Sequence, residues 1–239
     1  GLLKRGITRV ITPGTIIEEG MLQARKNNWL GAVFIEQQAT STLLQWGLAS
    51  ADVSTGEFLV KQGEGNDDLR QELLKLEASE LIWGEPEMQG ENPSWCPSNL
   101  YLTHVNKTPF TQPEAESALK KHFQLTTTQG LGLNECPLAL RAAGGLIAYL
   151  KETKPNIQEL DNDSSCAIPL DFPQICVSEE VLLIDAQTRR NLEITCTQKD
   201  GHFHGSLLWA LDRTLTAMGG RCLRRWLETP LINIDEILA

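Results

Sequence analysis

The sequence has no C-x-x-C pair, although it contains six cysteines among its 239 residues. A structural zinc site brings its thiolates together through short loops, and a disulfide framework is typical of much smaller secreted domains. The cysteine spacing fits neither pattern. We therefore predict reduced thiols, as in cytoplasmic proteins.

Long hydrophobic runs are missing as well. The apolar stretch 207–211 is one of the longest, whereas a membrane helix needs about 20 apolar residues. The N-terminal residues do not resemble a signal peptide, and the first residue is not Met. The last residues, 232–238, keep an apolar pattern. We expect a piece of a longer cytoplasmic protein that does not contact membranes.

The chain also lacks a nucleotide-binding loop. No glycine is followed by lysine, so the phosphate-cradling motif G-x-x-x-x-G-K-[ST] is absent. No Ser/His/Asp or Cys/His set lies in a recognisable local frame. These absences predict a chain that is not an enzyme and binds no cofactor by itself.

Basic residues are scarce in the first three quarters of the chain. Residues 1–180 contain 14 lysines and arginines against 24 acidic residues, whereas residues 181–239 contain 7 of each. The first part therefore accounts for the whole net charge of −10. Because contact with DNA phosphates requires positive potential, this part is better suited to bind a protein than DNA.

Hydrophobic periodicity predicts a mixed α/β fold. Three strand-like runs at 29–36, 43–53 and 57–61 precede a helix at 66–78, and a turn at 54–56 joins the second and third runs into a hairpin. Shorter strands are expected at 81–83 and 100–105. Further helices are expected at 113–123, where Pro113 suits the first turn, and at 137–152. The glycines of the latter helix, Gly144 and Gly145, indicate close approach of another backbone.

The Pro-rich segment 153–173 is the expected domain boundary. After residue 180 the pattern becomes mainly helical, with helices expected near 185–195, from 205 onward, and at 218–227.

Carboxylates near the predicted strands raise a rival interpretation. Strands followed by a helix and further β and α units resemble the ribonuclease H-like fold, whose enzymes hold two metals between clustered carboxylates. Glu36, Asp52 and Glu57 are the candidates. However, Asp52 precedes a turn, Glu36 ends its strand, and the fourth predicted strand, 81–83, has no carboxylate. We interpret the three as surface charges and keep a metal-dependent nuclease as the alternative.

Two further polar sets fall in the C-terminal part. Asp200, His202 and His204 could share a metal, but they lie in a glycine-bounded polar loop where histidines are usually solvated, so we predict no metal site. Arg221, Arg224 and Arg225 share one helix face. That face can contact phosphates or a neighbouring domain, or it can pair with nearby carboxylates, as can Arg189 and Arg190. Leu223, Trp226 and Leu227 are expected to turn toward the core.

The C-terminal sixty residues carry a family resemblance. DAQTRRNLEI at 185–194 is followed by GSLLWALDRT at 205–214 and by TAMGGRCLRRWL at 216–227 before Pro230. Upstream, VITPGT at 10–15, LASADVSTGEF at 48–58 and AAGGL at 142–146 follow in the matching order. Together these segments resemble the MutS family, in particular bacterial and perhaps cyanobacterial members.

The resemblance implies a domain layout and a role. Residues 1–165 are similar to the connector domain (domain II, ribonuclease H-like), and residues 166–239 to the start of the core or lever domain (domain III). Members of this family are dimers that recognise mismatched double-stranded DNA, hydrolyse ATP with magnesium, and recruit MutL. The resemblance therefore implies a non-catalytic piece that couples the ATPase state to the DNA clamp and helps to dock MutL.

Two surface expectations follow from this resemblance. The helix at 113–123 is expected to face MutL, with Glu114, Glu116, Ser117 and Lys120 exposed. Phe34-Ile35-Glu36 matches the family's Phe-x-Glu mismatch reader in letters only, because that reader lies upstream of the connector, so we expect Phe34 in the core. A MutS-like relative that serves recombination rather than repair stays open.

Overall fold

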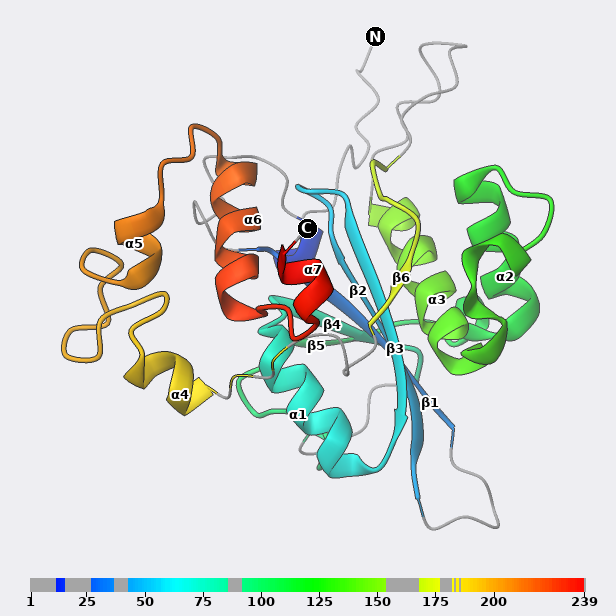
Figure 1. Cartoon of the computed structure of the whole chain (residues 1–239). Helices are drawn as coiled ribbons and strands as arrows, with labels where there is room; N and C mark the ends of the chain where they lie inside the picture. The colour runs from blue at the N-terminus through cyan, green and yellow to red at the C-terminus, as the bar shows by residue number, and fades with distance from the viewer. Residues whose placement is uncertain are drawn as a thin grey trace, which may run out of the picture. The chain divides into compact units, whose positions relative to one another are not determined.

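A computed structural model of the chain describes residues 12–15, 27–36, 43–85, 92–153, 168–176, 182, 184 and 186–238 (Figure 1). The contacts divide the chain into two compact units: residues 1–17 and 28–176 form the first, and residues 18–27 and 177–239 form the second. Each unit is described by itself. None of the described helices is long and apolar enough to cross a membrane.

A six-stranded mixed sheet forms the centre of the first unit, in the order β5-β4-β1-β2-β3-β6. Strands β1 (Leu30–Glu36), β2 (Gln45–Asp52) and β3 (Glu57–Glu64) are antiparallel neighbours. Strand β4 (Glu80–Trp83) runs parallel to β1, and β5 (Leu102–His104) runs parallel to β4. All five predicted strands and their order along the chain are thereby confirmed.

The predicted hairpin between β2 and β3 is present. Its turn places Gly56 at φ +85°, a conformation that glycine adopts without strain, and the Gly56 amide donates to the Asp52 carbonyl at 2.9 Å. The register pairs Asp52 with Glu57 at the start of the hairpin.

Helices cover both faces of the sheet (Figure 1). Alternate residues of β1 explain why: Leu30, Ala32 and Phe34 belong to the core shared with α2 (Gln112–Phe123) and α3 (Pro137–Thr153). Val33 points to the opposite core, where it packs with Leu69 and Leu73 of α1 (Asn66–Leu76).

Helix α3 approaches its neighbours closely, as its glycines predict. A Cβ on Gly144 would lie 2.2 Å from the Ala115 Cα of α2, and a Cβ on Gly145 would lie 2.5 Å from the Phe110 ring. Phe110 ends the short 3-10 helix η2 (Thr108–Phe110). Two further 3-10 turns, η3 (Gln129–Leu131) and η4 (Leu133–Glu135), lead into α3.

Residues 168–176 pack with the first unit, although the sequence predicts the second domain from residue 166. Strand β6 (Gln174–Ile175) pairs parallel to β3, and the Asp171 amide donates to the Gly56 carbonyl at 2.7 Å. This short strand has no hydrophobic alternation from which it could be predicted. Residues 154–167, most of the predicted boundary segment, lie outside the described residues.

The second unit contains α4 (Ala186–Asn191), α5 (Leu207–Leu211), α6 (Ala217–Glu228) and α7 (Ile234–Leu238). Side-chain oxygens begin two of these helices: Ser206 Oγ accepts from the Trp209 amide at 3.2 Å, and Thr216 Oγ1 accepts from the Gly219 amide at 3.0 Å. Among the described residues of this unit, the buried hydrophobic side chains are Ile194 and Leu208.

Candidate functional site

The predicted partner-binding surface lies on α2 and is partly exposed. Glu114 and Ser117 are exposed, whereas Glu116 and Lys120 are half-buried, contrary to expectation. The reason is local pairing: Lys120 Nζ lies 3.4 Å from Glu116 Oε2, and Gln112 Nε2 donates to Glu116 Oε1 at 3.1 Å. An open hollow of about 590 Å³ lies beside this pair. Its lining consists of Pro113, Glu116, Ser117, Lys120, Lys121, Gln124 and Leu125.

The arginines of α6 do not form one exposed stripe. Arg221 is only 4% exposed, while Arg225 is exposed. Arg224 Nε donates to Glu228 Oε1 at 3.0 Å, and Arg189 Nη1 of α4 lies 4.0 Å from the same oxygen. A single carboxylate thus brings α4 and α6 together, in keeping with pairing to nearby acids.

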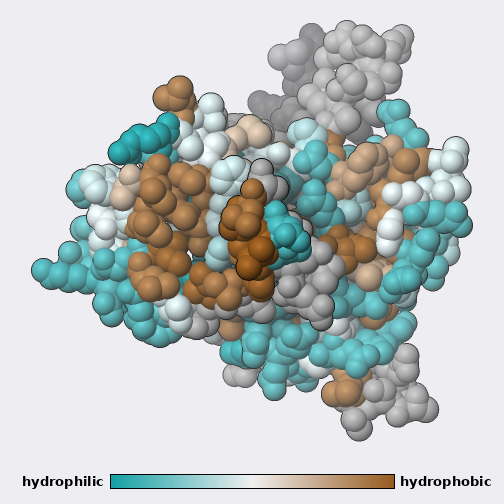
Figure 2. All heavy atoms as spheres, in the orientation of Figure 1, coloured by the Kyte–Doolittle hydropathy of each residue, from teal (hydrophilic) through white to brown (hydrophobic). Residues whose placement is uncertain are grey.

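The apolar side of α6 also differs from the prediction. Trp226 is 63% exposed rather than in the core, and Met218 is exposed as well. Figure 2 shows apolar side chains gathered over the helices of the second unit. Helical periodicity predicts an apolar face on this helix, but it does not show which other residues pack against that face. Among the described residues, Trp226 and Met218 on α6 stay exposed.

The three polar side chains predicted in the loop 199–205 are not gathered into a metal-binding group. Asp200, His202 and His204 are exposed, and His204 lies against Trp209 with ring centroids 4.1 Å apart. Within the described parts of the chain, no group of three or more His, Cys, Asp or Glu side chains is placed to hold a metal.

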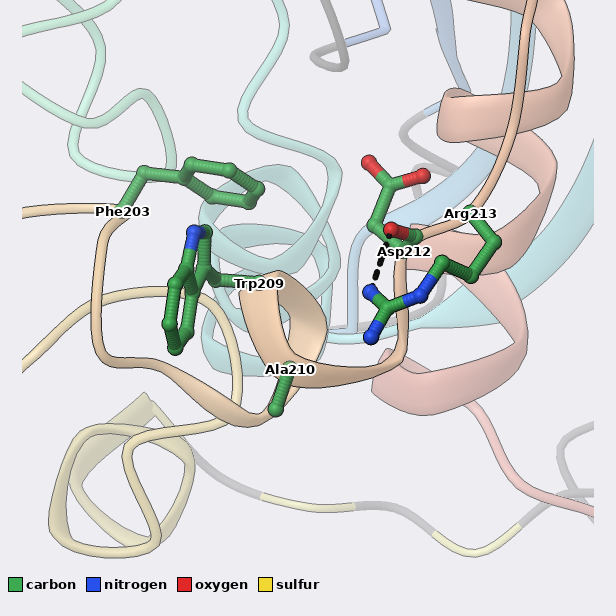
Figure 3. A pocket seen from close by; sticks show the side chains of 5 residues that line it. All are labelled: Phe203, Trp209, Ala210, Asp212 and Arg213. Atoms are coloured by element: carbon green, nitrogen blue, oxygen red, sulfur yellow. Dashed lines mark hydrogen bonds between the residues drawn. The ribbon is translucent and has the colours of Figure 1, made fainter.

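A hollow of about 390 Å³ adjoins this loop. Figure 3 shows the Phe203 ring beside the Trp209 indole, with Arg213 turned back toward Asp212. The guanidinium Nη1 of Arg213 donates to the Asp212 carbonyl at 3.0 Å, and Ala210 completes the lining. The hollow offers aromatic faces and one cation, but its walls do not gather a catalytic set.

Asp52 and Glu80, in the described part of the first unit, are buried carboxylates, and the burial of Asp52 corrects its interpretation as a surface charge. Asp52 is fully buried: its Oδ1 accepts from the Ser54 amide at 2.9 Å, and its Oδ2 accepts from the Asn28 amide at 3.1 Å. Glu80 is also fully buried. It begins β4, one residue before the predicted strand, so the statement that this strand has no carboxylate was wrong.

The other two nuclease candidates are engaged differently. Glu36 Oε1 lies 3.4 Å from Arg141 Nη1, and Glu57 Oε2 accepts from Thr55 Oγ1 at 3.4 Å. An acid that opens an apolar strand, as Glu80 opens Leu81-Ile82-Trp83, is the sequence feature that could have revealed the missed buried carboxylate.

Phe34 is part of the core, as predicted. Its ring is 5% exposed, and the Arg141 guanidinium lies 3.6 Å from the ring centroid. Arg141 Nε also donates to the Phe110 carbonyl at 2.8 Å. Burial lowers the pKa of Arg141 from its ordinary value, and Glu36 opposes that effect. A ring held in this way cannot wedge into DNA.

The cysteines in the described part of the chain are free thiols. Burial raises the pKa of the Cys96 and Cys136 thiols, so neither is activated as a nucleophile. Cys166 lies outside the described residues.

Comparison with known proteins gives the same order of domains as the sequence motifs. Residues 33–162 match the family model described as MutS domain II, and residues 187–239 match MutS domain III. The DNA mismatch repair protein MutS of Synechococcus sp. strain WH7803 is 58% identical over 238 residues, covering 99% of this chain and 26% of that relative.

Two proteins of the same name from Prochlorococcus marinus are equally similar. Strain MIT 9303 gives 57% identity over 100% of this chain and 26% of the relative, and strain SARG gives 59% over 99% and 26%. The chain spans about a quarter of the length of these cyanobacterial relatives. Since the domain II match alone covers residues 33–162, more than half of its length, this chain belongs to the MutS family of DNA mismatch repair proteins.

Proposed function

We propose that this chain is the connector and the start of the core of an ATP-dependent mismatch-recognition protein, and that it relays the ATPase state toward the parts that hold DNA. The observation that supports the proposal is that the structure and the family models each divide the chain into two parts. The chain forms two compact units, and it matches two consecutive MutS domains. A relay requires rigid bodies whose arrangement ligands can bias.

We further propose that the first unit is ribonuclease H-like without being a nuclease. Three antiparallel strands, then a helix, then parallel strands β4 and β5 support the fold assignment. Against nuclease activity, the oxygens of Asp52 and Glu80 already accept hydrogen bonds from protein donors. Cleavage of DNA by the 239-residue chain with magnesium or manganese would favour the nuclease alternative and contradict the relay.

The intact protein is proposed to be a cytoplasmic homodimer that binds mismatched DNA, ATP and magnesium through parts outside this chain. The family name of the relatives and the match to domains II and III support this extension. A role in recombination rather than repair is the second candidate. Restoration of a normal mutation rate in a mutS-deficient host by the intact protein would support repair.

Helix α2 is the proposed contact for MutL. Glu114 and Ser117 are exposed there beside the hollow, and the acidic charge of this unit favours a protein partner over DNA. Reversing the charge of Glu114 and Glu116 in the intact protein should weaken MutL capture by roughly tenfold.

Asp200→Lys, a charge reversal at an exposed position of the second unit, is the control for each single reversal on α2 and should leave MutL capture unchanged. Thermal unfolding of each variant checks that the fold is kept. Capture that is unchanged in the Glu114 and Glu116 variant, with an intact fold, would remove α2 from the proposed interface.

A further inference from the structure

A buried carboxylate joins the segment 12–15 to three elements of the first unit. Glu80 is 0% exposed and accepts three hydrogen bonds. The Gly14 amide donates to Oε2 at 3.0 Å, whereas Thr103 Oγ1 of β5 and the Tyr149 hydroxyl of α3 each donate to Oε1 at 2.7 Å. Hydrogen bonds to a carboxylate are stronger than those between neutral groups.

The protonation of Tyr149 suits this arrangement. Burial raises the pKa of Tyr149 well above its ordinary value, and the nearby Glu80 carboxylate raises it further. The hydroxyl therefore keeps its proton and remains a donor to Glu80 across the neutral range.

Asn28 holds the same segment from its other side. Its Nδ2 donates to the Pro13 carbonyl at 3.0 Å, and its Oδ1 accepts from Ser79 Oγ at 2.7 Å. The Asn28 amide in turn donates to Oδ2 of the buried Asp52 at 3.1 Å. Pro13 and Gly14, adjacent in the chain, are thus bound through two separate routes.

The segment itself is a closed turn, and a side chain at position 14 would crowd Leu30 of β1. The Thr15 amide donates to the Thr12 carbonyl at 3.0 Å, and the Thr12 amide donates to Thr15 Oγ1 at 2.9 Å. A Cβ on Gly14 would lie 2.7 Å from Leu30 Cδ1 and 3.0 Å from Leu30 Cβ. The backbone therefore lies directly against β1.

A buried carboxylate is not the simplest way to stabilise a core. Its desolvation is unfavourable, and well-packed apolar residues are often as stable. What directional hydrogen bonds add is a fixed geometry between the groups they join. Here the groups joined are one backbone turn, two parallel strands and the longest described helix.

We infer that Glu80 and Asn28 form a clasp that fixes residues 12–15 to the sheet, so that a rotation of the first unit is transmitted to the backbone at Thr12. Glu80 and Asn28 are positioning residues in this device. The clasp stands on the contacts above, whereas its use in signalling rests on the proposed relay.

Amide hydrogen exchange of the 239-residue chain, followed by NMR, tests the clasp. Glu80→Gln and, separately, Asn28→Ala should each accelerate exchange of the Gly14 and Thr15 amides by roughly tenfold or more. Amides in the centre of α3 should keep the exchange rates of the unmodified chain. Glu135→Gln, the same substitution at an exposed position, is the control and should change neither set.

Asn28→Ala keeps the inference testable if Glu80→Gln does not fold, because it leaves the buried charge in place. Unchanged exchange at Gly14 in the folded variants would overturn the clasp. Equal acceleration throughout the first unit would also overturn it, since Glu80 and Asn28 would then only support the core.

Failure of the relay can be told apart from failure of the clasp. In the intact parent protein, a Glu80→Gln variant with fast Gly14 exchange and normal ATP-driven movement of the first unit would remove the clasp from the relay. The clasp itself would stand in that case.

Discussion

At the scale of single residues, the polar side chains in buried positions were the hardest to predict. Hydrophobic alternation places Phe34 in the core correctly, but it assigns Asp52 to the surface and omits Glu80 from its strand. Both acids are buried because donors from distant parts of the chain reach them. No local pattern encodes partners 24 or 66 residues away.

The same limit applies to α6. Spacing alone puts Arg221, Arg224 and Arg225 on one face, yet their exposure differs because Arg221 is buried and Arg224 pairs with Glu228. The sequence indicates pairing with nearby carboxylates as one alternative, but it does not identify Glu228 as the partner.

Glu72 provides a pH-dependent prediction at this scale. Burial opposes ionisation of its carboxyl, but hydrogen bonds and charges from Lys75 at 2.8 Å and Lys61 at 3.0 Å outweigh burial and hold its pKa below the ordinary value. Because the unfolded chain then binds the proton more readily, this stabilisation is present above the unfolded pKa and is lost as the pH falls through the folded pKa.

Glu72→Gln should therefore lower the free energy of unfolding by about 1 kcal/mol near neutral pH. The difference from the unmodified chain should shrink between neutral pH and an acidic pH below the pKa of the folded carboxyl, because both states are then protonated. Urea unfolding at the two pH values measures it. A difference of the same size at both values would contradict the role assigned to the ion pairs.

At the scale of elements, the sequence predicted most of the first unit. The strand runs, the hairpin and helices α1, α2 and α3 appear within a few residues of their expected bounds. Local sequence features specify these elements: alternating apolar and polar residues in the strands, a Ser-Thr-Gly turn in the hairpin, and a proline in the first turn of α2. Strand β6 has none of these, since its two residues pair with β3 only after the chain has returned to the sheet edge.

The packing of α2 on α3 gives an element-scale prediction. A Cβ on Gly144 would lie 2.2 Å from Ala115 Cα and 2.3 Å from Ala115 Cβ, so Gly144→Ala should push the helices apart. We expect a loss of about 1–3 kcal/mol in the free energy of unfolding, after the higher helix propensity of alanine has offset part of the cost.

Gly130→Ala is the matched control, because nothing lies within 4 Å of the position its Cβ would take. Chemical denaturation of both variants compares them. Equal stability of Gly144→Ala and the unmodified chain would show that α2 is not held tightly against α3.

At the scale of the whole molecule, the two units differ in how well their described residues form a core. The first unit has two buried clusters, one on each face of its sheet. In the second unit Leu215 is fully exposed, and Trp226 and Ile234 are exposed, while few apolar side chains are buried. Composition hinted at different roles through the acidic charge of the first part, but the sequence could not reveal this difference in packing.

This contrast predicts different behaviour of the two pieces. Residues 1–176, which contain the whole first unit together with residues 18–27 of the second, should unfold in one cooperative thermal transition, because both buried clusters of the described residues lie within this range. Residues 177–239 should melt without a sharp transition and bind the dye ANS through exposed apolar side chains. Circular dichroism and ANS fluorescence of the separate fragments test this. A cooperative transition of 177–239 without ANS binding would contradict it.

The relay is tested most directly by the distance between the two units in the intact parent protein. Spin labels at Ser117→Cys on α2 and Lys199→Cys in the second unit, with the native cysteines changed to serine, report that distance by pulsed electron paramagnetic resonance. We predict different distance distributions with ATP and with ADP. Identical distributions in all nucleotide states would contradict the account.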